Sequence, residues 1–203
     1  MRYTPTSGKT LARMAIRPAF YDLSWQPASW DFWMWALNAR KFGANCVVFP
    51  PDPVFSYADE SQESQGAMFG DVVRPIARLL GLIVDCREQT DDDFEIYHWF
   101  DPEIGLDQAD LPKLAKPPTG PPTVTIRHSY KHPERNSPPL WTEFAAEIGA
   151  TVIPDAHDYP LSVDDRFEMY ASASRNYFWS NGPGAAAIFS DLPSVMVNPV
   201  ASY

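Results

Sequence analysis

The chain has 203 residues, of which 45% are hydrophobic and 14% aromatic, enough to build the core of one medium domain or of two small lobes. Its 16 Lys and Arg residues against 26 Asp and Glu residues give a net charge of −10, which argues against a general binder of nucleic acid or anionic membranes. Any phosphate that the protein holds must therefore sit in a local basic pocket. No apolar run approaches the roughly 20 residues that span a bilayer.

The N-terminal residues 1–10 are polar and contain no hydrophobic signal core, so we expect a cytoplasmic protein. Cys46 and Cys86 lie in strand-like segments, where a cysteine is most often a small buried hydrophobic residue with an inert thiol. The cysteines and the scattered histidines match no zinc-ligand spacing. We therefore expect neither a disulfide nor a bound metal.

The first half of the chain alternates apolar segments with helical patterns, which is typical of α/β folds with a largely parallel sheet. Strands are predicted at 15–23, 44–49, 82–86 and 94–100, and helices at 30–41 and 67–80. Gly43 and Gly81 end the two helices. Pro75 is expected either to kink the second helix or to mark its true start. The polar segment 57–65 is predicted to be a loop.

The composition changes between Asp101 and Pro122, where six prolines occur. The segment 106–122 is therefore predicted to link an N-terminal α/β lobe, 1–105, to a C-terminal Rossmann-like lobe, 123–203. In the second half, strands are predicted at 123–127, 151–154, 176–179 and 194–197, and helices at 137–149, 162–172 and 184–190. Four strands joined by three helices predict a doubly wound parallel sheet.

Polar residues follow three predicted strands of the second half. Open parallel sheets bind ligands beyond the carboxyl ends of their strands, and this rule gathers Arg127, Arg135, Asn136, Ser137, Asp155, Ser180, Asn181 and Gly182. Arginine forms paired, charge-assisted hydrogen bonds with a diphosphate, and a helix N-terminus offers free backbone amides to an anion. These residues predict a pyrophosphate pocket. In the alternative interpretation they are structural, with Arg127 paired to a carboxylate, Arg135 a solvated loop charge and Ser137 a helix cap.

The turn Ser180-Asn181-Gly182-Pro183, the alanine-rich stretch after it and the strand led by Leu192-Pro193 resemble the donor-site motif of heptosyltransferase-type GT-B glycosyltransferases. In that family an Asp-Ser/Thr-Gly-Pro turn precedes such a helix and strand. The segments 152–155 and 166–173 also resemble residues that precede the motif. This chain departs from the family in three ways. The family's Asp is absent unless Asn181 takes its position, and the usual histidine of the helix is also absent. The chain is much shorter than a typical two-lobed member.

The resemblance implies a reduced GT-B fold and metal-independent transfer of a sugar from a nucleotide diphosphate to an acceptor hydroxyl, with no cofactor. Arg127, Arg135 and the amides at Asn181 and Gly182 would then stabilise the departing diphosphate. Asp22, at the end of the first strand, would be the general base, with Asp52 and Asp59 as alternatives.

Two other classes of function stay open. One is a non-catalytic protein that keeps this architecture in an assembly or regulatory role. The other is a phosphate-binding enzyme of different chemistry, because a fold does not fix a function.

Two further features have structural explanations that we favour. Asp91-Asp92-Asp93 resembles the Asp-x-Asp motif that holds a metal in other transferases, but it follows a polar connector and is predicted to be a solvated acidic turn. The four residues Trp25, Trp30, Trp33 and Trp35 offer rings for stacking on sugars. Their spacing around one helix favours packing in the core or at a lobe interface.

Overall fold

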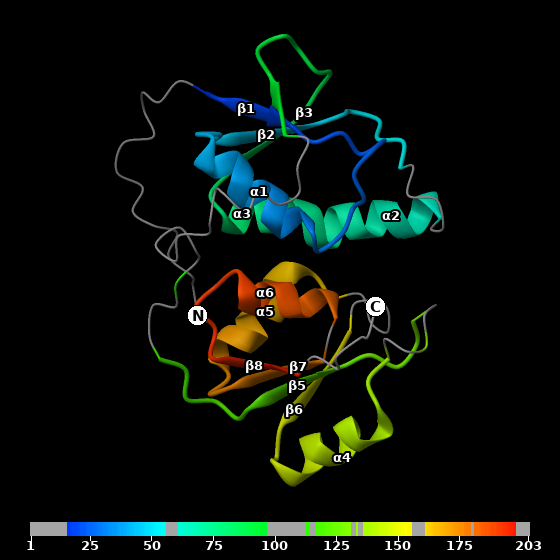
Figure 1. Cartoon of the computed structure of the whole chain (residues 1–203), viewed down its shortest axis with the longest axis vertical. Coiled ribbons are helices and arrows are strands. Elements are labelled where there is room, and N and C mark those ends of the chain that lie inside the picture. Colours follow the sequence, from blue (N-terminus) through cyan, green and yellow to red (C-terminus); the bar gives the residue numbers. More distant parts are fainter. Residues whose placement is uncertain are drawn as a thin grey trace. The chain divides into compact units, whose positions relative to one another are not determined.

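The computed structural model describes residues 16–55, 61–96, 113, 117–130, 133, 136–155, 161–179 and 181–197. The chain divides into two compact units, residues 2–112 and 113–203. Each unit contains a sheet of four parallel strands flanked by helices, so the chain has a Rossmann-like α/β architecture, as predicted (Figure 1). Residues 113 and 117–122 of the predicted linker are described, and the rest of it lies outside the described residues.

The N-terminal sheet has the strand order β3-β2-β1-β4. Its strands are β1 (Pro18–Phe20), β2 (Cys46–Phe49), β3 (Ile83–Cys86) and β4 (Phe94–Glu95). The chain moves outward from β1 to β2 and β3, and then returns to the other side of β1 with β4. The helices α1 (Phe32–Lys41) and α3 (Arg74–Leu79) lie on the same side of this sheet (Figure 1).

Aromatic side chains form the core between α1 and the N-terminal sheet. The Tyr21 ring meets Phe32 and Trp35 edge to face, with centroids 4.9 and 4.8 Å apart. Trp30, Trp33 and Trp35 are buried, which confirms the predicted core packing for these three residues. Trp25, in the loop after β1, is 85% exposed, so the prediction is wrong for that residue.

The second helix of this unit begins earlier than predicted. The helix α2 (Gln62–Met68) starts after Ser61, whose hydroxyl accepts a hydrogen bond from the Ser64 amide at 3.1 Å. It continues through a π-helical turn, η2 (Phe69–Val73), into α3. Pro75 lies at the start of α3, where its missing N–H is accommodated by the widened turn before it. The predicted loop at 57–65 is therefore wrong from Gln62 onward.

The C-terminal sheet has the order β6-β5-β7-β8. Its strands are β5 (Thr123–Ile126), β6 (Thr151–Pro154), β7 (Asn176–Trp179) and β8 (Ser194–Val197). The helix α4 (Pro139–Glu147) covers one face, and α5 (Val163–Ser172) and α6 (Ala185–Ile188) cover the other (Figure 1). This is the predicted doubly wound arrangement.

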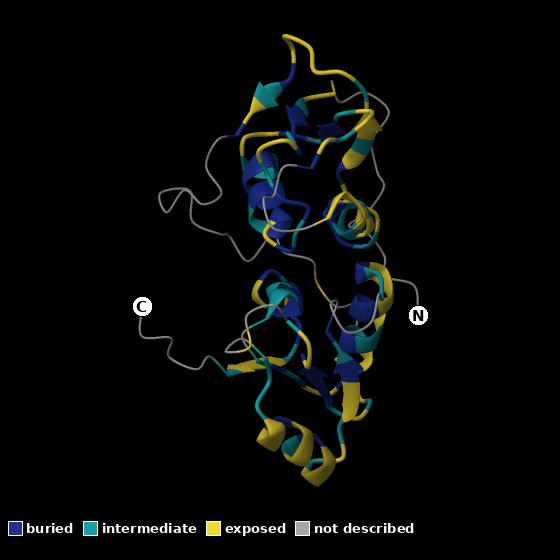
Figure 2. Cartoon of the chain, turned by 90° about the vertical axis from the view of Figure 1, so that its right-hand side faces the viewer, coloured by how far each residue is buried: buried dark blue, intermediate teal, exposed yellow. Residues whose placement is uncertain are grey.

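The two faces of the C-terminal sheet bury different kinds of side chain. On the α4 face, Trp141 packs with Val124 and Ile126, and its ring centroid lies 5.5 Å from that of Trp179. On the α5 face, the hydroxyls of Thr125 and Tyr170 are 3.0 Å apart. In this sheet β5 is fully buried, whereas much of the outer strands β6 and β8 and of α4 is exposed (Figure 2). The sheet therefore has an aromatic face and a partly polar face.

Candidate functional site

The carboxyl ends of β5 and β7 mark the place where the winding of the C-terminal sheet changes direction. The chain passes from β5 to β6 on one side, and then to β7 and β8 on the other. Open α/β sheets bind ligands at such a point. The register pairs Thr125 with Phe178, so the chain leaves both strands at the same level, with Arg127 following β5 and Asn181 following β7.

Arg127 forms a buried ion pair with Asp155, which follows β6. Its Nε donates to Asp155 Oδ2 at 2.8 Å, and the two side chains are 3% and 1% exposed. The backbone amide of Asp155 donates to the Ile126 carbonyl at 2.8 Å, which fixes Asp155 against the end of β5. The structural alternative for Arg127, pairing with a carboxylate, is therefore what the structure contains. Removing either partner of such a pair would leave an uncompensated buried charge.

Among the described residues, Nε1 of Trp179 at the end of β7 is a buried donor without a hydrogen-bond partner, and its ring packs against Trp141 of α4. Two more such donors, Arg127 Nη1 and Asn181 Nδ2, belong to the loops that follow β5 and β7. Buried polar atoms in folded proteins are nearly always paired, and an unpaired buried donor costs about 1–3 kcal/mol. Both atoms are donors, so a ligand that brings acceptor oxygens, such as a phosphate, would satisfy them.

Asn136 and Ser137 shape the connection between β5 and α4. The Ser137 hydroxyl accepts from the Arg127 amide at 3.1 Å, and the Ser137 amide donates to the Arg127 carbonyl at 2.9 Å. Asn136 Oδ1 accepts from the Tyr130 amide at 2.9 Å. The helix α4 begins only at Pro139, so the interpretation of Ser137 as its cap is wrong. Ser137 and Asn136 instead position the backbone around Arg127.

The turn after β7 is built by the side chain of Asn181. Its Oδ1 accepts from the Gly184 amide at 3.1 Å and caps a short 3-10 helix, η5 (Gly182–Gly184). The α-helix that follows, α6, has only four residues instead of the predicted 184–190. So short a helix has little dipole to offer an anion. The contribution of this turn to a ligand therefore comes from the Asn181 side chain, with half-buried Gly182 beside it.

Arg166 supports the loop that carries Asp155. This fully buried arginine of α5 donates through Nε to the Leu161 carbonyl at 3.2 Å and through Nη1 to the Pro154 carbonyl, so it ties together the two ends of the β6–α5 connection. No functional role is predicted for Arg166 from the sequence. The sequence feature that could have revealed its burial is its position on the apolar stripe of α5, which is formed by Val163, Phe167 and Tyr170.

The buried polar face beneath the site includes the hydroxyl of Tyr170. Burial raises the pKa of this phenol above its ordinary value, against the smaller lowering effect of its hydrogen bond with Thr125. Tyr170 therefore serves this face as a neutral hydrogen-bonding group.

The remaining predicted site residues lie elsewhere. Arg135, Ser180 and Asp59 are outside the described residues. Asp22 belongs to the N-terminal unit, where its Oδ1 accepts from the amide and hydroxyl of Ser24 at 2.8 and 2.6 Å. Asp52 is exposed in the loop after β2.

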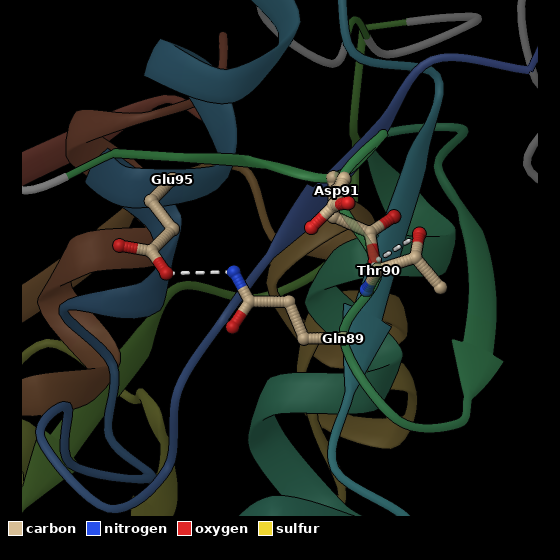
Figure 3. Close-up of a pocket in the computed structure, with 5 residues that line it drawn as sticks. Gln89, Thr90, Asp91 and Glu95 are labelled. Atoms are coloured by element: carbon tan, nitrogen blue, oxygen red, sulfur yellow. Dashed lines mark hydrogen bonds between the residues drawn. The ribbon is translucent and has the colours of Figure 1, made fainter.

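A second feature is an open depression of about 510 Å³ in the N-terminal unit. It is lined by Gln89, Thr90, Asp91, Asp93 and Glu95 (Figure 3). Gln89 Nε2 donates to Glu95 Oε1 at 2.6 Å. Within the described parts of the chain, no three His, Cys, Asp or Glu side chains form a group that could hold a metal ion.

Asp93 differs from its neighbours in the acidic turn. Asp91 and Asp92 are exposed, as predicted for a solvated turn, whereas Asp93 is 8% exposed and ion-paired with Arg87. The hydrogen bond from Arg87 is the main cause that holds the pKa of Asp93 below its ordinary value. The prediction of a solvated turn is therefore wrong for Asp93, which has a structural role.

No protein-family model matches this chain, and neither a curated protein nor a solved structure matches it significantly. None of the helices in the described segments is long and apolar enough to cross a membrane.

Proposed function

We propose that this protein is a reduced GT-B-like glycosyltransferase that binds a nucleotide diphosphate sugar at the β5/β7 edge and transfers the sugar to an acceptor hydroxyl. The observation that carries the proposal is the pair of buried donors without partners, Arg127 Nη1 and Asn181 Nδ2, which follow neighbouring strands at the switch point of the sheet. Oxygens of the diphosphate would accept from both.

The electrostatics of the site favour directional binding over general attraction of anions. Asp155 neutralises the charge of Arg127, so the diphosphate would be held mainly by oriented hydrogen bonds. A hydrogen bond from a charged donor contributes about 1.5–3 kcal/mol net. Such a site suits a chain with a net charge of −10, which repels anions at long range.

In this proposal the general base is Asp22 of the N-terminal unit. Ser24 occupies its Oδ1, so Oδ2 is the oxygen that would accept the proton of the acceptor hydroxyl. Cys46 and Cys86 are free thiols, in keeping with the cytoplasmic location that we include in the proposal.

A non-catalytic binding protein of the same architecture is the second candidate. The observation that favours it is the ion pair itself. Because Asp155 neutralises the charge of Arg127, Arg127 would stabilise the negative charge of a departing diphosphate less. Turnover separates the two candidates. Transfer or hydrolysis of the donor that is lost in Asp22→Asn, with donor binding retained, supports the enzyme, whereas binding without turnover supports the second candidate.

Calorimetry with a panel of nucleotide diphosphate sugars tests the binding step. Arg127→Lys keeps a cation for Asp155 but loses the planar fork, and we expect it to weaken donor binding by about tenfold. Arg175→Lys, at an exposed arginine of the same unit, is the matched control and should bind as the wild type does. If no donor binds to the folded protein, or if Arg127→Lys binds unchanged, the proposal is wrong.

A further inference from the structure

The outer edge of β8 is unpaired in the part of the chain that the structure describes. The strand pairs with β7 on one side and has no neighbouring strand on the other. On the β7 side, the Asn176 amide donates to the Pro193 carbonyl at 2.8 Å. Because successive residues of a strand direct their backbone groups to opposite sides, Val195 shares the β7 side with Pro193. Ser194 and Met196 therefore direct their N–H and C=O groups outward.

This edge lacks the features by which proteins keep an edge strand from pairing. Charged side chains, proline and short strands are the usual protection. The other edge strands in the described segments each have one of them: β3 carries exposed Asp85, β6 ends at Pro154, and β4 has only two residues, including Glu95. By contrast, β8 has four uncharged residues and no proline, and its Val195 and Met196 are 36% and 38% exposed.

The residues of β8 are complementary to themselves in an antiparallel pair with two-fold symmetry. When the two-fold axis passes through Val195, perpendicular to the sheet, Val195 lies opposite Val195 of the second copy, and Ser194 lies opposite its Met196. The two Ser194–Met196 pairs then exchange both of their N–H···O bonds, so every outward backbone group of these residues gains a partner. The two valines form an apolar cross-strand contact. Although the chain has a net charge of −10, no charged residues of β8 oppose each other in this pair.

We propose that β8 is a dimerisation edge, to which a second copy of this chain adds its own β8 in antiparallel orientation. The C-terminal sheets of the two copies then form one continuous sheet. The unpaired backbone groups require an extended strand as the occupant, and the self-complementarity of β8 about Val195 selects a second copy over a foreign peptide. This interface does not depend on the ligand proposed for the β5/β7 edge, so either proposal can fail without the other.

Sedimentation equilibrium of the full chain measures the dissociation constant of the dimer. We expect the wild type to form dimers in a concentration-dependent manner. Val195→Lys and Val195→Glu each place like charges opposite each other on the axis, and each should weaken the dimer about tenfold or more. Ile188→Lys, at an apolar residue of α6 that is 55% exposed, is the matched control and should dimerise as the wild type does. Circular dichroism of each variant verifies that the fold is intact.

Mixing the two Val195 variants tests the position of the axis. In the mixed dimer the charges on the axis are opposite, so an equimolar mixture of Val195→Lys and Val195→Glu should associate about tenfold more tightly than either variant alone. A folded wild type that stays monomeric at all concentrations would overturn the proposal. Wild-type dimerisation by both variants alone, or a mixture that associates no more tightly than they do, would also overturn it.

Discussion

The guanidinium of Arg87 holds the carboxylate of Asp93 through two hydrogen bonds, from Nη1 to Oδ2 at 2.7 Å and from Nη2 to Oδ1 at 2.6 Å. Asp93 Oδ2 also accepts from the Thr90 amide at 2.8 Å. These bonds organise the connection between β3 and β4. A motif with the spacing of a metal site thus serves to fix a loop.

Replacing Asp93 should therefore destabilise the N-terminal unit. We expect Asp93→Asn to lower the free energy of unfolding by about 1–3 kcal/mol, because one of the two oxygens that accept from Arg87 and from the Thr90 amide becomes an NH2 donor, and only Asp85 is left as a counter-charge for Arg87. Asp91→Asn, at an exposed position of the same turn, should change it by less than about 0.5 kcal/mol. Urea unfolding of both variants measures the difference, and equal effects would contradict the structural role of Asp93.

The same ion pair should make stability depend on pH. The pKa of Asp93 is lowered in the folded state, mainly by the hydrogen bond from Arg87, so its contribution is full above the unfolded value of about 3.9 and is lost as the pH falls through the folded value. The difference in unfolding free energy between wild type and Asp93→Asn should be constant from about pH 7 to 5 and shrink below about pH 4. Urea curves across this range measure it. A difference that persists unchanged at about pH 3 would refute the expectation.

Asn181 allows the cap and the ligand contact to be separated. Asn181→Asp keeps the acceptor for the Gly184 amide, so the cap is retained, and any loss of stability comes from the anionic oxygen that takes the buried position of Nδ2. The same change replaces the donor Nδ2 with an anionic oxygen, and donor binding should weaken about tenfold or more. Asn181→Ala should also lose about 1 kcal/mol of stability. Calorimetry and urea unfolding test both effects, and wild-type affinity in Asn181→Asp would remove Nδ2 from the site.

Gly120 packs closely against the end of α5. A Cβ at this position would lie 2.6 Å from the backbone oxygen of Ser172, an atom that cannot move aside as a flexible side chain can. We expect Gly120→Ala to cost about 1–3 kcal/mol of stability. Gly70→Ala, where a Cβ meets nothing within 4 Å, is the control and should be neutral or stabilising by up to about 1 kcal/mol. A cost for Gly120→Ala no larger than that of Gly70→Ala would contradict the close packing.

The sequence was most informative about the strands. The predicted bounds at 151–154, 176–179 and 194–197 are those observed, because short apolar runs end there at polar or turn residues. The start of α2 was missed because only Gln65 of that helix is buried, so no apolar stripe marks it. Its one local signal was Ser61, which caps the first turn.

For the candidate site, chain order brought Arg127 and Asp155 together but did not predict that they pair with each other. The rule for parallel sheets brought Arg127 and Asp155 to one edge, and the structure places them in contact. Which carboxylate an arginine selects depends on tertiary geometry, and the sequence carries no local signal for it. The same holds for Asp93, whose burial depends on Arg87 six residues earlier folding back over it.

The unlike strand orders of the two units have an evolutionary and practical consequence. A tandem duplication copied strand for strand would repeat one order, whereas here the first strand of each unit meets a different later strand on its far side, the fourth in one unit and the third in the other. The described strands of the two halves therefore cannot be superposed in chain order. In a chimera that exchanges the third or the fourth strand of one half for that of the other, the exchanged strand would therefore have different neighbours in the sheet.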